Sequence, residues 1–214
     1  MMEPYLQLSN FMDAEHPAIA SELEALGRKG DDLDQTVSIY YFVRDSIRYD
    51  PFNIKLNPEH MRVSRVMKER RGHCIDKAML FIAICRKSGI PARLGMAKVR
   101  NHMGTASFEK VLQSDVLTPH GYAEVYLRDK WVKCTPAFNK ELCERLGVAP
   151  LEFDGVEDSI FQQFDRAEGG FMEYLEDYGT FSDLPVELIT QLMHAEYPHL
   201  FDNEGSFREE LLKR

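Results

Sequence analysis

The sequence predicts an α+β fold in which one buried helix precedes a small antiparallel sheet. Residues 74–88 carry almost no polar face before their last turn, and a helix that is apolar all round is a buried helix. Gly89 supplies its C-terminal cap. Two runs, 121–127 and 131–135, have strand-like alternation and are joined by a short turn, which indicates a β-hairpin. A helix followed by paired strands is an order typical of an α+β fold.

Hydrophobic spacing, caps and turn residues predict the remaining elements. Upstream helices are expected over 17–26, 32–49 and 63–70, the second of them capped by Asp31 or Asp32. A strand is expected over 92–99, followed by a polar loop over 101–115. Beyond Pro136, helices are expected over 140–146, 158–165, 171–177 and 185–193, with a turn at Asp154-Gly155.

The composition argues against several classes of partner. A net charge of −9 repels phosphate backbones, so we expect no nucleic-acid partner. The longest apolar run covers residues 78–85, well short of the roughly 20 residues of a membrane span, and no signal peptide is visible. The four cysteines form no CxxC pair, which favours free thiols in the cytoplasm. The oligomeric state stays open.

Cys74 is the first candidate for chemistry. It comes two residues after Gly72, which interrupts the preceding regular structure, and it is the first residue of the buried helix. Unpaired N–H groups at a helix start favour a thiolate and lower the pKa of a thiol. A thiolate is the reactive form of cysteine. The alternative is that Cys74 is an inert core cysteine, as most free cysteines are.

His120 is the second candidate. It opens the strand 121–127 just after Pro119, so it can point across a cleft toward the start of a helix. Taken alone, such a residue is more often a structural histidine. A cysteine nucleophile needs a base that the fold brings near, so the two residues must be judged together.

Three ordered motifs resemble those of the transglutaminase-like superfamily. They are Arg71-Gly72-His73-Cys74 with the apolar helix ending in Gly89-Ile90-Pro91-Ala92-Arg93, then His120-Gly121-Tyr122-Ala123-Glu124-Val125-Tyr126-Leu127, and finally Trp131-Val132-Lys133-Cys134-Thr135-Pro136. The resemblance covers roughly residues 33–136. It implies a papain-like core with helical additions at both ends. We therefore expect one domain over 1–214, with the core at about 33–136, a lead-in over 1–32 and a helical extension over 137–214 packed on the core.

The resemblance also implies the chemistry. Cys74 would attack a carboxamide carbonyl, and His120 would take the thiol proton and return it to the leaving amine. Water or an amine would resolve the thioester, giving a peptidase, amidase or deamidase in the first case and a transglutaminase in the second. The substrate would be a peptide, a protein or a small amide. No cofactor is expected, and the calcium dependence of large animal transglutaminases is not carried over, because no acidic loop has metal-ligand spacing.

The third member of the constellation departs from the family. Where the family has an aspartate, this chain has Thr135, and a hydroxyl can orient an imidazole but adds no negative charge to stabilise imidazolium. Asn139 and Asp154 are the alternatives, and a site without a third member is another. The departure also motivates a rival function, that of a catalytically inactive binding or scaffold module.

Other polar residues near the motifs have weaker candidacies. His73 is expected to form a wall of the site and Asp76 to complement the helix dipole. Glu124 is a candidate substrate contact, and Cys134 should point away from the site by strand alternation. The loop around His102 could border the cleft. A zinc site built from these cysteines and histidines lacks the paired short spacing of structural zinc, so no metal is expected.

Overall fold

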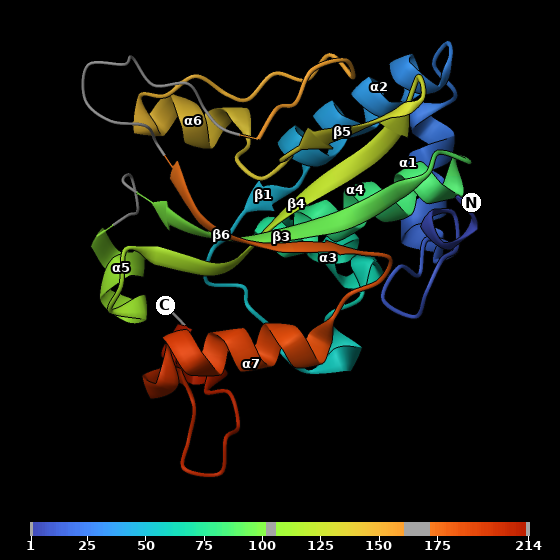
Figure 1. The fold of residues 1–214 in the computed structure, drawn as a ribbon. Helices are drawn as coiled ribbons and strands as arrows, with labels where there is room; N and C mark the ends of the chain where they lie inside the picture. Colours follow the sequence, from blue (N-terminus) through green and yellow to red (C-terminus); the bar gives the residue numbers. More distant parts are fainter. Residues whose placement is uncertain (1, 102–105, 161–171, 213–214) are drawn as a thin grey trace.

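A four-stranded antiparallel sheet carries one long buried helix on one face. The structure is a computed structural model that describes residues 2–101, 106–160 and 172–212. The strand order in the sheet is β5-β4-β3-β6, and a separate two-stranded parallel ribbon pairs β1 with β2. Helix α4 packs against β3 and β4, and α2 and α3 pack on α4 (Figure 1). The N-terminus of α4 therefore lies beside the sheet.

The bounds of the elements are as follows. The helices are α1 (Pro17–Leu26), α2 (Asp32–Ser46), α3 (Val63–Glu69), α4 (Cys74–Lys87), α5 (Ala106–Leu112), α6 (Lys140–Leu146) and α7 (Val186–Glu196). The strands are β1 (Arg48–Tyr49), β2 (Arg71–Gly72), β3 (Ala92–Asn101), β4 (Val116–Leu127), β5 (Lys130–Cys134) and β6 (Met172–Phe181). Short 3₁₀ helices are η1 (Glu3–Tyr5), η2 (Pro58–His60), η3 (Pro198–Leu200) and η4 (Glu209–Leu212). In the described residues no helix has the length and apolarity needed to cross a bilayer.

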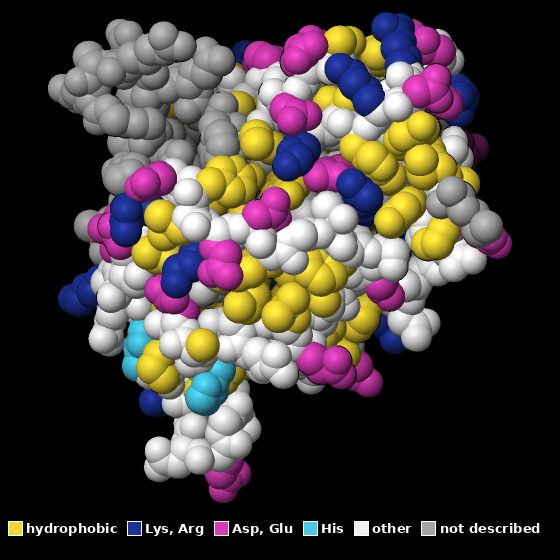
Figure 2. All heavy atoms as spheres, in the orientation of Figure 1, with side chains coloured by type: hydrophobic (Ala, Val, Ile, Leu, Met, Phe, Trp, Pro, Cys, Tyr) yellow, Lys and Arg dark blue, Asp and Glu magenta, His cyan; other side chains and the backbone are white. Residues whose placement is uncertain are grey.

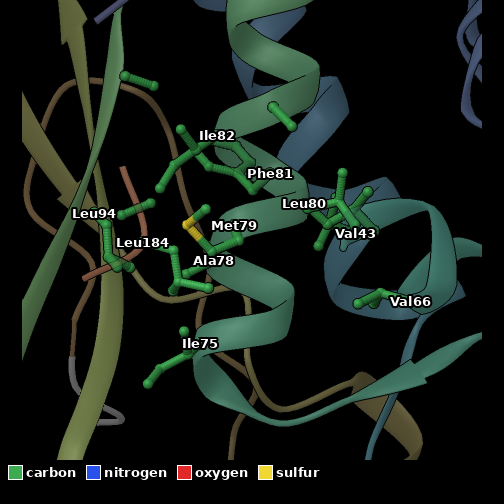
Figure 3. Packing of buried hydrophobic residues seen from close by; sticks show 14 of the residues in the cluster. Val43, Val66, Ile75, Ala78, Met79, Leu80, Phe81, Ile82, Leu94 and Leu184 are labelled. Atoms are coloured by element: carbon green, nitrogen blue, oxygen red, sulfur yellow. The ribbon is translucent and has the colours of Figure 1, made fainter. Parts of the chain in front are cut away.

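Helix α4 begins at a reciprocal cap and is buried along nearly its whole length. The imidazole of His73 accepts a hydrogen bond from the Ile75 N–H at 3.1 Å, and the carboxylate of Asp76 accepts one from the His73 N–H at 3.3 Å. This arrangement is a capping box, which satisfies N–H groups that a helix start leaves unpaired. Figure 3 shows Leu80 directed toward Val43 of α2, whereas other α4 side chains face the sheet. The expected buried helix is confirmed.

The hairpin of β4 and β5 sets the position of Thr135. Val125 pairs with Val132 and Ala123 with Cys134, where β5 ends. Thr135 is the next residue, so strand alternation predicts that its side chain lies on the face of His120 and Tyr122, opposite Cys134. The predicted hairpin is confirmed, and β4 begins earlier than expected, at Val116.

Three predictions for the irregular regions differ from the structure. Residues 171–177 were expected to be helical, but Met172–Phe181 forms β6, antiparallel to β3. Pairing with the long edge of β3, which otherwise exposes a row of unpaired N–H and C=O groups, prevails over the helical spacing of the aromatic residues. The polar loop expected over 101–115 contains α5. The helix expected over 158–165 is absent from 158–160, where Ser159 bridges to Cys134, and its remainder lies outside the described residues.

The C-terminal segment packs on the core through α7. Leu184, Ile189, Met193 and Tyr197 belong to the same hydrophobic cluster as α4. The predicted helix over 185–193 is confirmed and runs on to Glu196. This helix packs against β4 and runs below the sheet in Figure 1, and its residues line the pocket that contains Cys74.

Candidate active site

Cys74 lies half-buried at the N-terminus of α4 and opens onto a pocket. The pocket encloses about 760 Å³ of empty space, part of it continuous with solvent. Its walls come from α3, α4, α7 and the start of β4, and most of the side chains that line it are apolar. The other three cysteines, Cys85, Cys134 and Cys143, are buried. Cys74 is therefore the thiol that a small molecule can reach.

The start of α4 and the middle of β4, where His120 lies, are in direct contact. A Cβ atom on Gly121 would lie 2.7 Å from Cγ1 and 3.0 Å from Cα of Ile75, closer than real Cβ contacts. The Gly121 N–H favours the charged form of the Cys74 thiol. Gly121 follows His120 and Ile75 follows Cys74, so the contact joins the two segments that carry the predicted residues. Glycine at 121 is what allows this close approach.

The ionisation of Cys74 differs from the prediction. Burial raises the pKa of the Cys74 thiol to about 11, although the N–H groups of Gly121 and Ile75 act in the opposite direction. We expected a lowered pKa from the helix start. Desolvation of the charged thiolate outweighs the N–H groups because the sulfur is enclosed between α4 and β4. In the unliganded protein Cys74 is a neutral thiol.

His120 is a buried and neutral imidazole. Its side chain is 3% exposed, and burial, helped by the nearby His73, lowers the pKa of His120 to about 4. A neutral imidazole can accept a proton from a neutral thiol. Near neutral pH both Cys74 and His120 are therefore uncharged.

The third position carries a hydroxyl that does not reach the imidazole. Among the described residues, the buried side-chain oxygen and nitrogen atoms that lack a hydrogen-bond partner are Nδ1 of His120 and Oγ1 of Thr135. Both belong to the predicted constellation. Buried polar atoms are rarely left unpaired, and those that are so often lie at functional sites. Thr135 thus occupies the third position in the register without bonding to His120.

The two alternatives for the third member are engaged elsewhere. The carboxylate of Asp154 is exposed and accepts hydrogen bonds from Val156 N–H at 2.8 Å and Glu157 N–H at 3.0 Å, which lower its pKa. Asp154 therefore stabilises its own turn. The side-chain oxygen of Asn139 accepts a hydrogen bond from the Tyr49 N–H at 3.1 Å and so ties the start of α6 to β1.

Three weaker candidates also have defined roles. Glu124 is 4% exposed and forms an ion pair with Arg93 at 2.6 Å, so it stabilises the outer face of the sheet. His73 caps α4 and lines the pocket, as expected of a wall. Cys134 lies in the main core, on the face opposite Thr135, as alternation predicts. His102 lies outside the described residues. No group of His, Cys, Asp or Glu able to hold a metal occurs in the part of the chain that the structure describes.

Sequence reasoning missed two residues that support the site. The Tyr197 hydroxyl donates to the Val116 carbonyl at 2.7 Å and accepts from the Thr118 N–H at 2.9 Å, which fixes the start of β4 just before His120. Nothing in the sequence marks Tyr197 among the aromatic residues of the extension. Lys77 is fully buried in α4, and burial lowers its pKa well below the usual value. A lysine within the apolar part of the helix could have indicated a buried, functionally or structurally engaged amine.

Comparison with known proteins shows the family to which the chain belongs. The model of the transglutaminase-like superfamily matches residues 20–136, more than half of the chain. Among solved structures, a proposed cysteine protease from Cytophaga hutchinsonii is 16% identical, with a TM-score of 0.49 over 84% of this chain. The chain spans 54%, about half, of the length of that protein. A search of curated protein sequences finds no match. The matched segment contains Cys74, His120 and Thr135, and the chain belongs to the transglutaminase-like superfamily of thiol-dependent enzymes.

Proposed function

We propose that the protein cleaves or transfers the acyl group of a carboxamide through a thioester on Cys74. The observation that carries this proposal is the position of Cys74, which opens a buried helix beside a pocket, with the next residue of that helix against β4 next to His120. Nucleophilic catalysis requires an accessible thiol next to a base, and Cys74 is the accessible one of the four thiols. A peptide, a protein or a small amide would be the substrate.

The proton follows a closed path in this mechanism. The sulfur of Cys74 forms a bond to the carbonyl carbon while the thiol proton moves to a nitrogen of His120. His120 then delivers that proton to the departing amine as the C–N bond breaks. The carbonyl oxygen becomes negative as the bond forms, and N–H groups at the junction of α4 and β4 would have to donate to it. Water or a second amine then releases the acyl group.

The neutral starting pair sets the timing of the proton transfer. The Cys74 thiol has a pKa near 11 and His120 has a pKa near 4, so proton transfer before substrate binding is unfavourable. We infer that proton transfer and attack on the carbonyl occur together. Thr135 adds no charge to stabilise imidazolium, which is consistent with this order.

Two substrates with one acyl group test the roles separately. A p-nitrophenyl ester has a leaving group that needs no proton, whereas the matching p-nitroanilide has one that does. We expect Cys74→Ala to abolish both activities, and His120→Gln to reduce anilide cleavage far more than ester cleavage. Thermal unfolding of each variant reports whether it is folded. Full anilide turnover by folded Cys74→Ala would exclude this mechanism.

A second candidate function is an inactive binding module. Two observations favour it. The Thr135 hydroxyl, which stands where the family has an aspartate, has no hydrogen-bond partner, and the raised pKa of Cys74 makes its thiol a poor nucleophile. The same assay separates the two functions. An inactive module would show equal background rates for the wild type and Cys74→Ala with both substrates, at every pH tested.

A further inference from the structure

We propose that the pocket beside Cys74 binds an uncharged, apolar side chain or acyl chain of the substrate, and that α7 determines its length. This inference rests on the proposed function, since it identifies the substrate class of the same thiol. The occupant is the group attached to the carbonyl carbon that Cys74 attacks. It would therefore be a hydrophobic residue of a peptide or an aliphatic acyl group.

The walls of the pocket are apolar on three sides. Helix α3 contributes Val63 and Val66, α4 contributes Met79, and α7 contributes Ile189 and Met193. All five of these residues are at least nine-tenths buried. Figure 2 shows hydrophobic side chains gathered on the surface over the region between the sheet and α7. An apolar group that enters this space exchanges water for close contact with methyl and methylene groups.

The charged residues of the lining are already paired. Lys55 contacts Glu209 at 2.8 Å, and Asp76 contacts Arg65 at 3.0 Å. The Tyr197 hydroxyl is engaged by backbone groups of β4. A charged ligand would lose its hydration without gaining a free counter-ion here, and that loss is costly. The pairing therefore selects against charged groups and favours apolar ones.

The position of the pocket suits a substrate group. About 760 Å³ of empty space, part of it open to solvent, lies between α3, α4 and α7. Cys74 lines the same space as Ile189 and Met193, so a chain bound against α7 has its carbonyl end near the sulfur. A side chain on α7 that projects further into the space would shorten the group that fits.

A series of iodoacetamides tests the pocket without requiring turnover. In each reaction the sulfur of Cys74 bonds to the methylene carbon, iodide leaves, and the thiol proton passes to solvent. Iodoacetamide, N-butyl, N-hexyl and N-(5-carboxypentyl) iodoacetamide would be compared on the full chain, with Cys74 labelling followed by peptide mass mapping. Rates are normalised to those of free glutathione.

We expect each added methylene to raise the normalised rate about fourfold until the pocket is filled. The carboxypentyl reagent should be slower than the hexyl reagent. Ile189→Phe should reduce the advantage of the hexyl reagent, and Ile189→Ala should extend it to longer chains. Gln191→Ala, on the exposed side of α7, is the matched control and should change nothing.

Two results would overturn the proposal. One is a normalised hexyl rate no higher than that of iodoacetamide in the wild type. The other is equal acceleration by the carboxypentyl and hexyl reagents. Because alkylation needs neither His120 nor a leaving amine, a chain-length dependence without amide turnover would support the pocket and contradict the proposed reaction. Amide turnover without a chain-length dependence would do the reverse.

Discussion

The buried His120 makes the stability of the fold depend on pH in a predictable direction. Burial lowers the pKa of His120 from 6.5 to about 4. A base with a lowered pKa in the folded state binds its proton more weakly there than in the unfolded chain. As the pH falls from about 7 to 4, the unfolded chain takes up the proton first, so the folded state loses stability. At about 1.36 kcal/mol per pKa unit the loss reaches roughly 3 kcal/mol.

The variant His120→Gln removes this loss. Urea unfolding at a series of pH values between 7 and 4 would give the free energy of unfolding of both proteins. Carboxylates and His73 also contribute to the curves, but their contributions are shared and cancel in the difference. We expect the wild type to lose roughly 3 kcal/mol more than His120→Gln over this range. His60→Gln, at an exposed histidine, is the matched control and should follow the wild type.

Parallel curves for the wild type and His120→Gln would refute the reasoning. They would mean that His120 titrates alike in the folded and unfolded chain and so is not the desolvated, neutral base described above. A variant curve that falls more steeply than the wild type would mean that a negative charge raises the pKa of His120. In that case a carboxylate would have to approach the imidazole in solution.

Three further predictions concern the junction, the helix and the third position. Gly121→Ala should cost about 1–3 kcal/mol of unfolding free energy and reduce acylation of Cys74, because its Cβ meets the Ile75 backbone; unchanged urea curves and rates would contradict the close contact. Lys77→Met should destabilise the protein by about 2 kcal/mol at pH 7, since the Lys77 nitrogen donates to the Arg44 and Ile47 carbonyls at the end of α2. A more stable variant in thermal unfolding would show that burying the polar nitrogen costs more than those bonds contribute. Thr135→Asp should raise the pKa of His120, measured by NMR titration of the imidazole, and should also raise amide turnover. Asp154→Ala should leave that pKa unchanged and the turnover within about twofold. The reverse pattern would assign the third position to Asp154.

The helix and the hairpin were predictable because local and global signals agree there. Residues 74–88 are apolar all round, and both ends carry caps, so burial and propensity favour the same element. The hairpin has a short turn that fixes its register, and the register alone places Thr135 on the face of His120. These features are encoded within a few residues, which is the range over which sequence patterns are informative.

The parts that were mispredicted depend on distant partners. The aromatic residues of β6 are spaced as in a helix, which is why a helix was predicted there. The segment instead forms a strand, because it pairs with β3, which lies far away in the chain. The pKa of Cys74 depends on how closely β4 covers the helix start, and local sequence shows only the helix start. Tyr197 fixes β4 from a helix more than 70 residues downstream. Such long-range contacts leave no local pattern.

The central claim is that the acyl group passes through a thioester on Cys74. Intact-mass analysis of enzyme quenched with acid during turnover of an apolar acyl amide tests it most directly, with peptide mapping of the adduct. We predict one acyl adduct, on Cys74 and removable by hydroxylamine, that is absent from Cys74→Ala and retained by Cys143→Ala. Turnover with no adduct in the wild type, or turnover and an adduct that both persist in Cys74→Ala, would contradict the claim.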